Sequence, residues 1–295
     1  MATLREIRSR ITGVKNTQKI TNAMKMVAAA KLRRAQEGIL AARPYARKIS
    51  QLLRHVVTKV DPSLHPLFAP REVHGILYVV VTADRGLCGA FNANIAKAAE
   101  HEMRTTAADF MKEGKVRLVT VGKKGFEYFG KRGYSLFSKH VGIFGSLEFQ
   151  RARGIVDEVT AGYLKGEFDR VVLVYNEFKS VIQQRIVVEQ LLPIPPEELA
   201  PEKSHVQVDY IYEPSSREII DALVPKHLNF QLWRVLLESN AAEQGARMSA
   251  MDNATENAKD IIKGLSLSFN NARQAAITKE LLEIVGGAEA LKKAG

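Results

Sequence analysis

The chain has 295 residues, 46% of them hydrophobic and 25% charged, which is enough apolar material for a core in one or two domains. Its single cysteine, Cys88, excludes an internal disulfide and a cysteine-cluster metal site. The longest apolar run, Ile76–Val81, is far shorter than the ~20 residues that a transmembrane helix needs. Residues 1–60 carry 14 Lys/Arg against two acidic residues, so this segment accounts for the whole net charge of +11. A uniformly basic nucleic-acid-binding domain is therefore not expected.

The segment 1–60 is predicted to form one long helix. Alternating steps of three and four residues from Leu4 to Val60 reach 17 positions, and 14 of these are apolar. The three exceptions fall together between positions 18 and 25, where the apolar stripe is expected to shift in phase, as at a stutter. The residues expected to carry the shifted stripe are Ile20, Met24 and Val27. A capping box formed by Thr3 and Glu6 is expected to start the helix.

The segment 213–295 is predicted to form a second long helix. A capping box of Ser215 and Glu218 begins it, an apolar helical pattern follows as far as Ile284, and Gly286-Gly287 is the expected end. A helix of this length needs a partner for its apolar stripe. The two long helices are therefore expected to pair antiparallel, with the C-terminal one overhanging by about 15–20 Å.

The residues between them, 61–212, have the pattern of an α/β domain. Short β-branched runs predict buried parallel strands at Gly75–Val81, Val116–Val121 and Arg170–Tyr175. Helices are predicted between and beside them, near 92–113, 123–131 and 147–165, and further strands at Gln183–Leu192 and Val206–Tyr212. The predicted fold class is α/β, a long antiparallel two-helix coiled coil with an inserted Rossmann-like α/β domain.

The loop Asp84–Gly89 is the one candidate for a small-ligand site. It lies between a predicted strand and a predicted helix, where backbone amides can bind anions. Neither GxGxxG nor the P-loop motif is present, so a tight turn with two glycines is the favoured interpretation. Cys88 has no histidine near it in sequence, and the seven histidines show no metal-ligand spacing. A metal is therefore not indicated, no local signature joins a nucleophile to a base, and a nucleotide-using enzyme is the weaker alternative.

The basic N-terminal helix has three interpretations. It can be a solvated charged face, a nucleic-acid-binding face, or a face that meets an acidic protein partner. Tyr45 is the only aromatic residue in 1–60, so the base-stacking side chains of many nucleic-acid-binding surfaces are missing. Charge alone leaves the three alternatives open.

Four motifs, taken in order along the chain, resemble the gamma subunit of F-type ATP synthases. They are Ile20–Gln36, Asp84–Asn92, Ala246–Ala254 and Ala272–Gly287. The resemblance implies a central rotor shaft that couples ion-driven rotation of the c-ring to conformational changes of catalytic beta subunits. It implies the alpha and beta subunits, the epsilon subunit and the c-ring as partners, no nucleic acid, and no catalytic residue in this chain. A basic coiled-coil nucleic-acid-binding protein is the alternative.

The resemblance also assigns contact residues. Met24 and Lys25 match the segment that faces an acidic lever of a beta subunit, and Arg247 matches the arginine that interacts around that segment. The matching positions nearer the C-terminus are Arg273, Gln274, Thr278 and Glu283, and those of the c-ring contact are Tyr210, Tyr212 and Glu213. No secretory signal is evident at the N-terminus. The expected location is peripheral, on the cytoplasmic face of a bacterial inner membrane.

Overall fold

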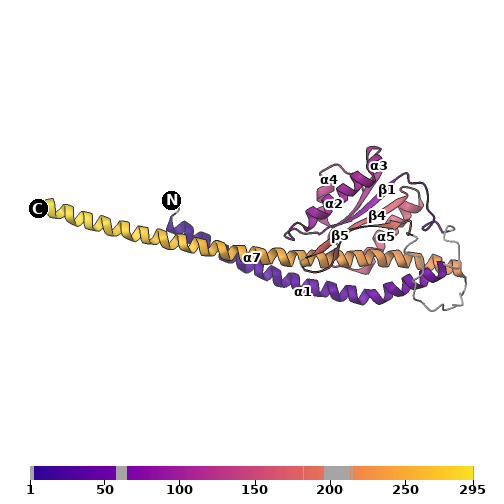
Figure 1. The fold of residues 1–295 in the computed structure, drawn as a ribbon, viewed down its shortest axis with the longest axis horizontal. Coiled ribbons are helices and arrows are strands. Elements are labelled where there is room, and N and C mark those ends of the chain that lie inside the picture. The colour runs from indigo at the N-terminus through magenta and orange to yellow at the C-terminus, as the bar shows by residue number, and fades with distance from the viewer. Residues whose placement is uncertain (1–2, 58–64, 182, 196–212, 214, 295) are drawn as a thin grey trace. The chain divides into compact units, whose positions relative to one another are not determined.

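The computed structural model describes residues 3–57, 65–181, 183–195, 213 and 215–294. The chain divides into two compact units, one formed by the residues up to Val27 with those from Met248 onward, the other by Ala28–Arg247. Helices α1 (Leu4–Val57) and α7 (Ser216–Ala294), both labelled in Figure 1, each contribute residues to both units. The predicted domain boundaries after residues 60 and 212 adjoin positions outside the described residues, and they stay a prediction.

A five-stranded sheet forms the centre of the unit Ala28–Arg247. Its order is β3-β2-β1-β4-β5, and the strands are β1 (Ile76–Val81), β2 (Val116–Val121), β3 (Leu136–His140), β4 (Arg170–Phe178) and β5 (Gln184–Leu192). The first four are parallel, and β5 pairs antiparallel with β4. The predicted strands are confirmed, except that Val206–Tyr212 lies outside the described residues. The prediction missed β3, a half-buried edge strand with no β-branched residue.

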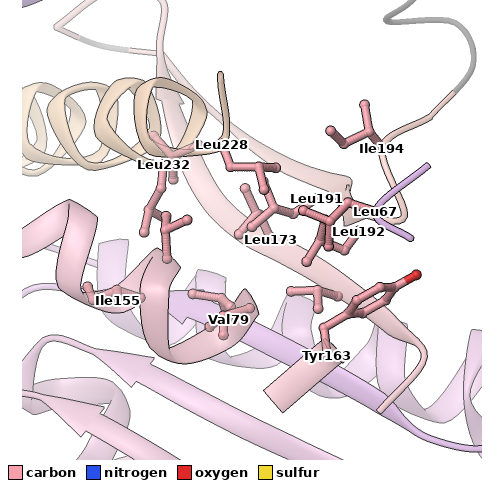
Figure 2. Packing of buried hydrophobic residues seen from close by; sticks show 14 of the residues in the cluster. Leu67, Val79, Ile155, Tyr163, Leu173, Leu191, Leu192, Ile194, Leu228 and Leu232 are labelled. Carbon is pink, nitrogen blue, oxygen red and sulfur yellow. The ribbon is translucent and has the colours of Figure 1, made fainter. Parts of the chain in front are cut away.

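Helices cover both faces of this sheet. On one face, α2 (Phe91–Thr106), α3 (Ala108–Lys112) and α4 (Lys123–Gly130) pack through one apolar cluster. On the other face, α5 (Phe149–Leu164) and the adjoining parts of α1 and α7 share a larger cluster. Figure 2 shows Val79 and Leu173 of the sheet, Ile155 of α5, and Leu228 and Leu232 of α7 within that cluster. The long helices are thus anchored by the same burial that folds the α/β domain.

The two long helices pair antiparallel within each unit. In the unit Ala28–Arg247, Tyr45 packs on Phe230 with a ring-centroid distance of 4.5 Å. In the other unit, the hydroxyls of Thr21 and Thr255 lie 2.8 Å apart, and Lys25 forms an ion pair with Asp252. In each unit the α7 numbers fall as the α1 numbers rise, from Thr21–Thr255 to Lys25–Asp252 and from Gly38–Leu237 to Tyr45–Phe230, so the predicted antiparallel coiled coil is confirmed.

The predicted phase shift of the α1 stripe is wrong. Thr21 is only 8% exposed, whereas Ile20 is 60% and Val27 is 56% exposed, so the original three-four register continues through the polar positions. Met24 is half-buried. Thr21 and Lys25 remain in the seam because α7 supplies a hydroxyl and a carboxylate opposite them. Polar pairs of this kind specify the register of a coiled coil at some cost in stability.

The ends of the long helices differ in part from the predictions. The Thr3–Glu6 capping box forms in both directions, with nitrogen–oxygen distances of 3.0 and 3.3 Å. The prediction that α7 ends at Gly286-Gly287 is wrong, because α7 continues to Ala294. Neither glycine adopts the left-handed conformation that would end the helix, and no atom outside the adjoining turns of the helix lies within 4 Å of the Cβ position of either. Residues 273–288 are all exposed. The stretch from Arg273 to Ala294 is about 33 Å long, so the overhang exceeds the prediction.

Candidate functional site

The loop after β1 uses its own carboxylate to bind backbone amides. Asp84 accepts hydrogen bonds from the amides of Lys123, Gly142 and Phe144, at 3.0, 2.8 and 3.1 Å. These amides begin α4 and the loop after β3, so one side chain ties three segments together. A phosphate could reach them only by displacing Asp84. These contacts make Asp84 a structural part of this corner, in keeping with the tight-turn interpretation.

The rest of this loop is also held from within. The Asn92 side chain accepts a hydrogen bond from the Ala83 amide at 2.9 Å and donates one to the Cys88 sulfur at 3.2 Å. Burial raises the pKa of the Cys88 thiol, which keeps it protonated and unreactive near neutral pH. Leu87 adopts a left-handed conformation, with φ of 62°, and remains exposed. The segment is thus a fixed structural corner.

Helix α7 docks on this corner through Arg247. The guanidinium donates to the Gly86 carbonyl at 3.1 Å and pairs with the buried carboxylate of Glu243, one turn earlier, at 2.5 Å. Burial raises the pKa of Glu243, and Arg247 opposes that rise. At Gly245 a Cβ atom would lie 3.2 Å from the Phe178 ring, so the absence of a side chain permits this close approach. The motifs Asp84–Asn92 and Ala246–Ala254, separate in sequence, therefore meet in space.

A charged cluster between α7 and the sheet was not found from the sequence. Arg234 donates to the Tyr175 hydroxyl at 3.0 Å and to Glu189 at 2.6 Å, and it lies 3.6 Å from Glu238. Burial raises the pKa of Glu238. No local pattern connects these residues, because they come from β4, β5 and α7. The cluster fixes the rotational setting of α7 on the sheet.

The predicted partner-contact residues fall in different surroundings. Within the unit that contains both chain ends, Met24 is half-buried and Lys25 is engaged by Asp252. Arg247 belongs to the other unit, where Glu243 and Gly86 hold it. The structure thus gives Lys25 and Arg247 partners inside the chain itself.

The remaining predicted contacts are exposed where they are described. Arg273 and Gln274 are exposed, Thr278 donates its hydroxyl hydrogen to the Gln274 carbonyl at 2.9 Å, and Glu283 lies 3.6 Å from Lys279. Glu213 is exposed as well. Tyr210 and Tyr212 lie outside the described residues. The predicted contacts from Arg273 to Glu283 therefore line one exposed stretch of α7, whereas Arg247 does not.

No helix in the described ranges is long and apolar enough to cross a membrane. No group of three or more His, Cys, Asp or Glu side chains among those residues is arranged to hold a metal ion.

Comparison with known proteins identifies the family. A family model described as ATP synthase matches residues 3–291. The ATP synthase gamma chain of Chlorobaculum tepidum is 57% identical, over 99% of this chain and 100% of the relative, and that of Prosthecochloris aestuarii is 57% identical over 99% of both. This chain belongs to the ATP synthase gamma chain family. The family assignment gives no support to the nucleic-acid alternative.

Solved structures agree with membership of the gamma chain family. The central stalk and c-ring structure of the Tetrahymena thermophila mitochondrial ATP synthase includes a chain 27% identical, with a TM-score of 0.59 over 80% of this chain and 99% of that one. A chain of the Euglena gracilis mitochondrial rotor has the same fold, with a TM-score of 0.67, 19% identity and coverage of 93% and 98%. The fold described above is thus one found in ATP synthase rotors.

Proposed function

We propose that this chain is the central rotor shaft of an F-type ATP synthase and carries no catalytic residue of its own. Family membership over nearly the whole chain supports the assignment, as does the likeness to a central-stalk chain. The observation that carries the proposal is the free end of α7. From residue 273 to residue 288 every side chain is exposed, and large apolar residues are among them. They are Ile277, Leu281, Leu282, Ile284 and Val285.

An exposed apolar stretch of this kind is costly in water. At about 25 cal/mol per Å² of apolar surface, covering a Leu or Ile side chain contributes roughly 1.5–3 kcal/mol. Exposed apolar surfaces that are contiguous mark interaction sites. A ring of alpha and beta subunits around this end would cover the side chains, and it is the partner that the family assignment favours.

The proposed mechanism is a difference in affinity between rotor faces and subunit conformations. A shaft that binds one conformer of a beta subunit better than another shifts that subunit toward the favoured state, by no more than the difference in binding free energy. Rotation then presents each face to each beta subunit in turn. Met24, Lys25, Arg247, Arg273, Gln274, Thr278 and Glu283 are the proposed contact residues.

The epsilon subunit and the c-ring are the other proposed partners. Tyr210, Tyr212 and Glu213 are the residues proposed to meet the c-ring. Through them the chain would be a peripheral protein on the cytoplasmic face of a bacterial inner membrane. The coupled ion follows from the c-ring and not from this chain.

The test is reconstitution of the ATP synthase with this chain in membrane vesicles. Assembly should restore ATP-driven ion pumping, and Met24→Lys should lower the ratio of pumping to hydrolysis, because it adds a cation beside the acidic beta-subunit segment. Met26→Lys, at an exposed position two residues away, is the matched control and should change the ratio less. A chain that fails to assemble with alpha and beta subunits would overturn the assignment. Equal ratios in the Met24 variant and the parent would overturn the role of Met24 alone.

A further inference from the structure

A groove runs between α1 and α7 within the unit Ala28–Arg247. Its volume is about 610 Å³, and its apolar lining includes Ile39, Ala42, Ala46, Phe230 and Leu237. The two alanines lie one helical turn apart and project only methyl groups, which leaves room between the helices. None of the partner contacts assigned above lines this groove.

The polar lining of the groove is strongly basic. Arg43, Arg47 and Arg54 line it from α1 and Arg234 from α7, whereas Glu238 is the only acidic residue among the described residues that line it. Glu238 and Arg234 already form an ion pair with each other. Arg43 and Arg47 are exposed and have no acidic partner among the described residues. The groove therefore offers uncompensated positive charge beside an apolar surface.

The length of the groove indicates what kind of ligand fits. Lining positions on α1 extend from Ile39 to Arg54, a span of about 22 Å at 1.5 Å per residue. A single phosphate would occupy a small fraction of that length, whereas four turns of helix would fill it. Arg43 and Arg47 are one turn apart, about 6 Å along the axis, which matches carboxylates spaced one turn apart on a second helix.

We propose that this groove binds an acidic amphipathic helix of a partner protein. The apolar face of that helix would lie on Ala42, Ala46 and Phe230, and its carboxylates would pair with Arg43 and Arg47. Complementary charge would set its register and speed its association. The proposal goes beyond the rotor function, because it concerns a different face and can be tested on the chain alone.

The experiment measures binding of a fluorescent synthetic peptide to the full chain by polarisation. The probe is an amphipathic helix of about four turns built from Ala and Leu, with Glu pairs one turn apart. Arg43→Gln with Arg47→Gln should weaken binding about tenfold, from the loss of two ion pairs. The matched control, Arg33→Gln with Arg34→Gln, removes the same charge from exposed positions outside the groove and should change binding less than about twofold.

Two further tests distinguish binding in the groove from attraction by charge alone. Ala46→Trp fills the groove without changing charge and should abolish binding, while circular dichroism checks that the helices are retained. A peptide with Gln in place of Glu should bind to the parent chain as weakly as the Glu peptide binds to the double variant Arg43→Gln with Arg47→Gln. The proposal would be overturned if the Arg43/Arg47 and Arg33/Arg34 double variants lost peptide affinity equally. Unchanged peptide binding by the Ala46→Trp variant would also overturn it. Displacement of the peptide by tripolyphosphate or by anionic lipid vesicles, with the same dependence on Arg43 and Arg47, would also overturn it.

Discussion

Arg234→Met should loosen the attachment of α7 to the sheet. The substitution keeps an unbranched apolar stem of similar length but removes the donors to Tyr175 and Glu189 and the cation beside Glu238. Removing one partner of a buried pair typically costs 3–5 kcal/mol. The Arg234 side chain is 35% exposed, so water replaces part of the lost hydrogen bonding. We therefore expect the free energy of unfolding to fall by about 2–3 kcal/mol.

The stability lost in the Arg234→Met variant should depend on pH. Burial raises the pKa of Glu238 above its ordinary value, and loss of the Arg234 cation should raise it further. A carboxyl group with a raised pKa in the folded state contributes stability below its unfolded pKa, and that contribution is lost as pH rises through the folded value. The variant should therefore be penalised more at pH 8 than at pH 5.

Urea unfolding monitored by tryptophan fluorescence measures this prediction. Trp233 is the only tryptophan, and it packs edge-on against Phe149 with a centroid distance of 5.9 Å, so it reports on the α7–α5 contact next to Arg234. The double variant with Glu189→Gln should recover about 1 kcal/mol, because one unpaired carboxylate is then absent. A loss below about 0.5 kcal/mol at pH 8, or an equal loss at both pH values, would refute the reasoning.

Three further predictions concern single features. Thr21→Val with Thr255→Val should leave the thermal stability of the chain within about 1 kcal/mol of the parent by circular dichroism, because both hydroxyls of a mutually bonded pair are replaced by methyl groups of similar shape. Tyr78→Phe should reduce the loss of stability between about pH 10 and 12 in urea titrations, since burial raises the pKa of Tyr78 to about 12 and the folded state keeps its proton longer than the unfolded one. Gly286→Ala with Gly287→Ala should slow amide exchange at the end of α7, since each change favours helix by about 1 kcal/mol and neither new Cβ meets another atom within 4 Å.

Each of these has its own contrary outcome. A double threonine variant whose midpoint of thermal unfolding lies far below that of the parent would contradict the expectation that the hydroxyl pair contributes little net stability. For the alkaline prediction, Tyr45→Phe is the control, because its ring is 52% exposed, and equal effects of both variants would contradict the role of Tyr78. Faster exchange in the alanine variant would show that the glycines are needed in the helix.

Periodicity alone was enough to find the main elements. The three-four spacing of α1 and the helical pattern of α7 depend on local geometry, because side chains three and four residues apart share a face. The buried strands β1, β2 and β4 were recognisable since strands covered on both faces are continuously apolar. Antiparallel pairing followed from chain connection, because both long helices join one α/β domain.

The tertiary structure alone decided where polar residues are tolerated and which segments meet. Thr21 breaks the apolar stripe in sequence, yet it stays in the seam because the hydroxyl of Thr255, 234 residues later, lies opposite it at hydrogen-bond distance. Arg247 and Gly86 meet across 161 residues, and Arg234 gathers partners from two strands. Local patterns report which side chains avoid water, whereas the partner of a polar group depends on what folding brings beside it. The sequence thus determined the elements of this protein, and the fold determined the polar contacts that hold them in register.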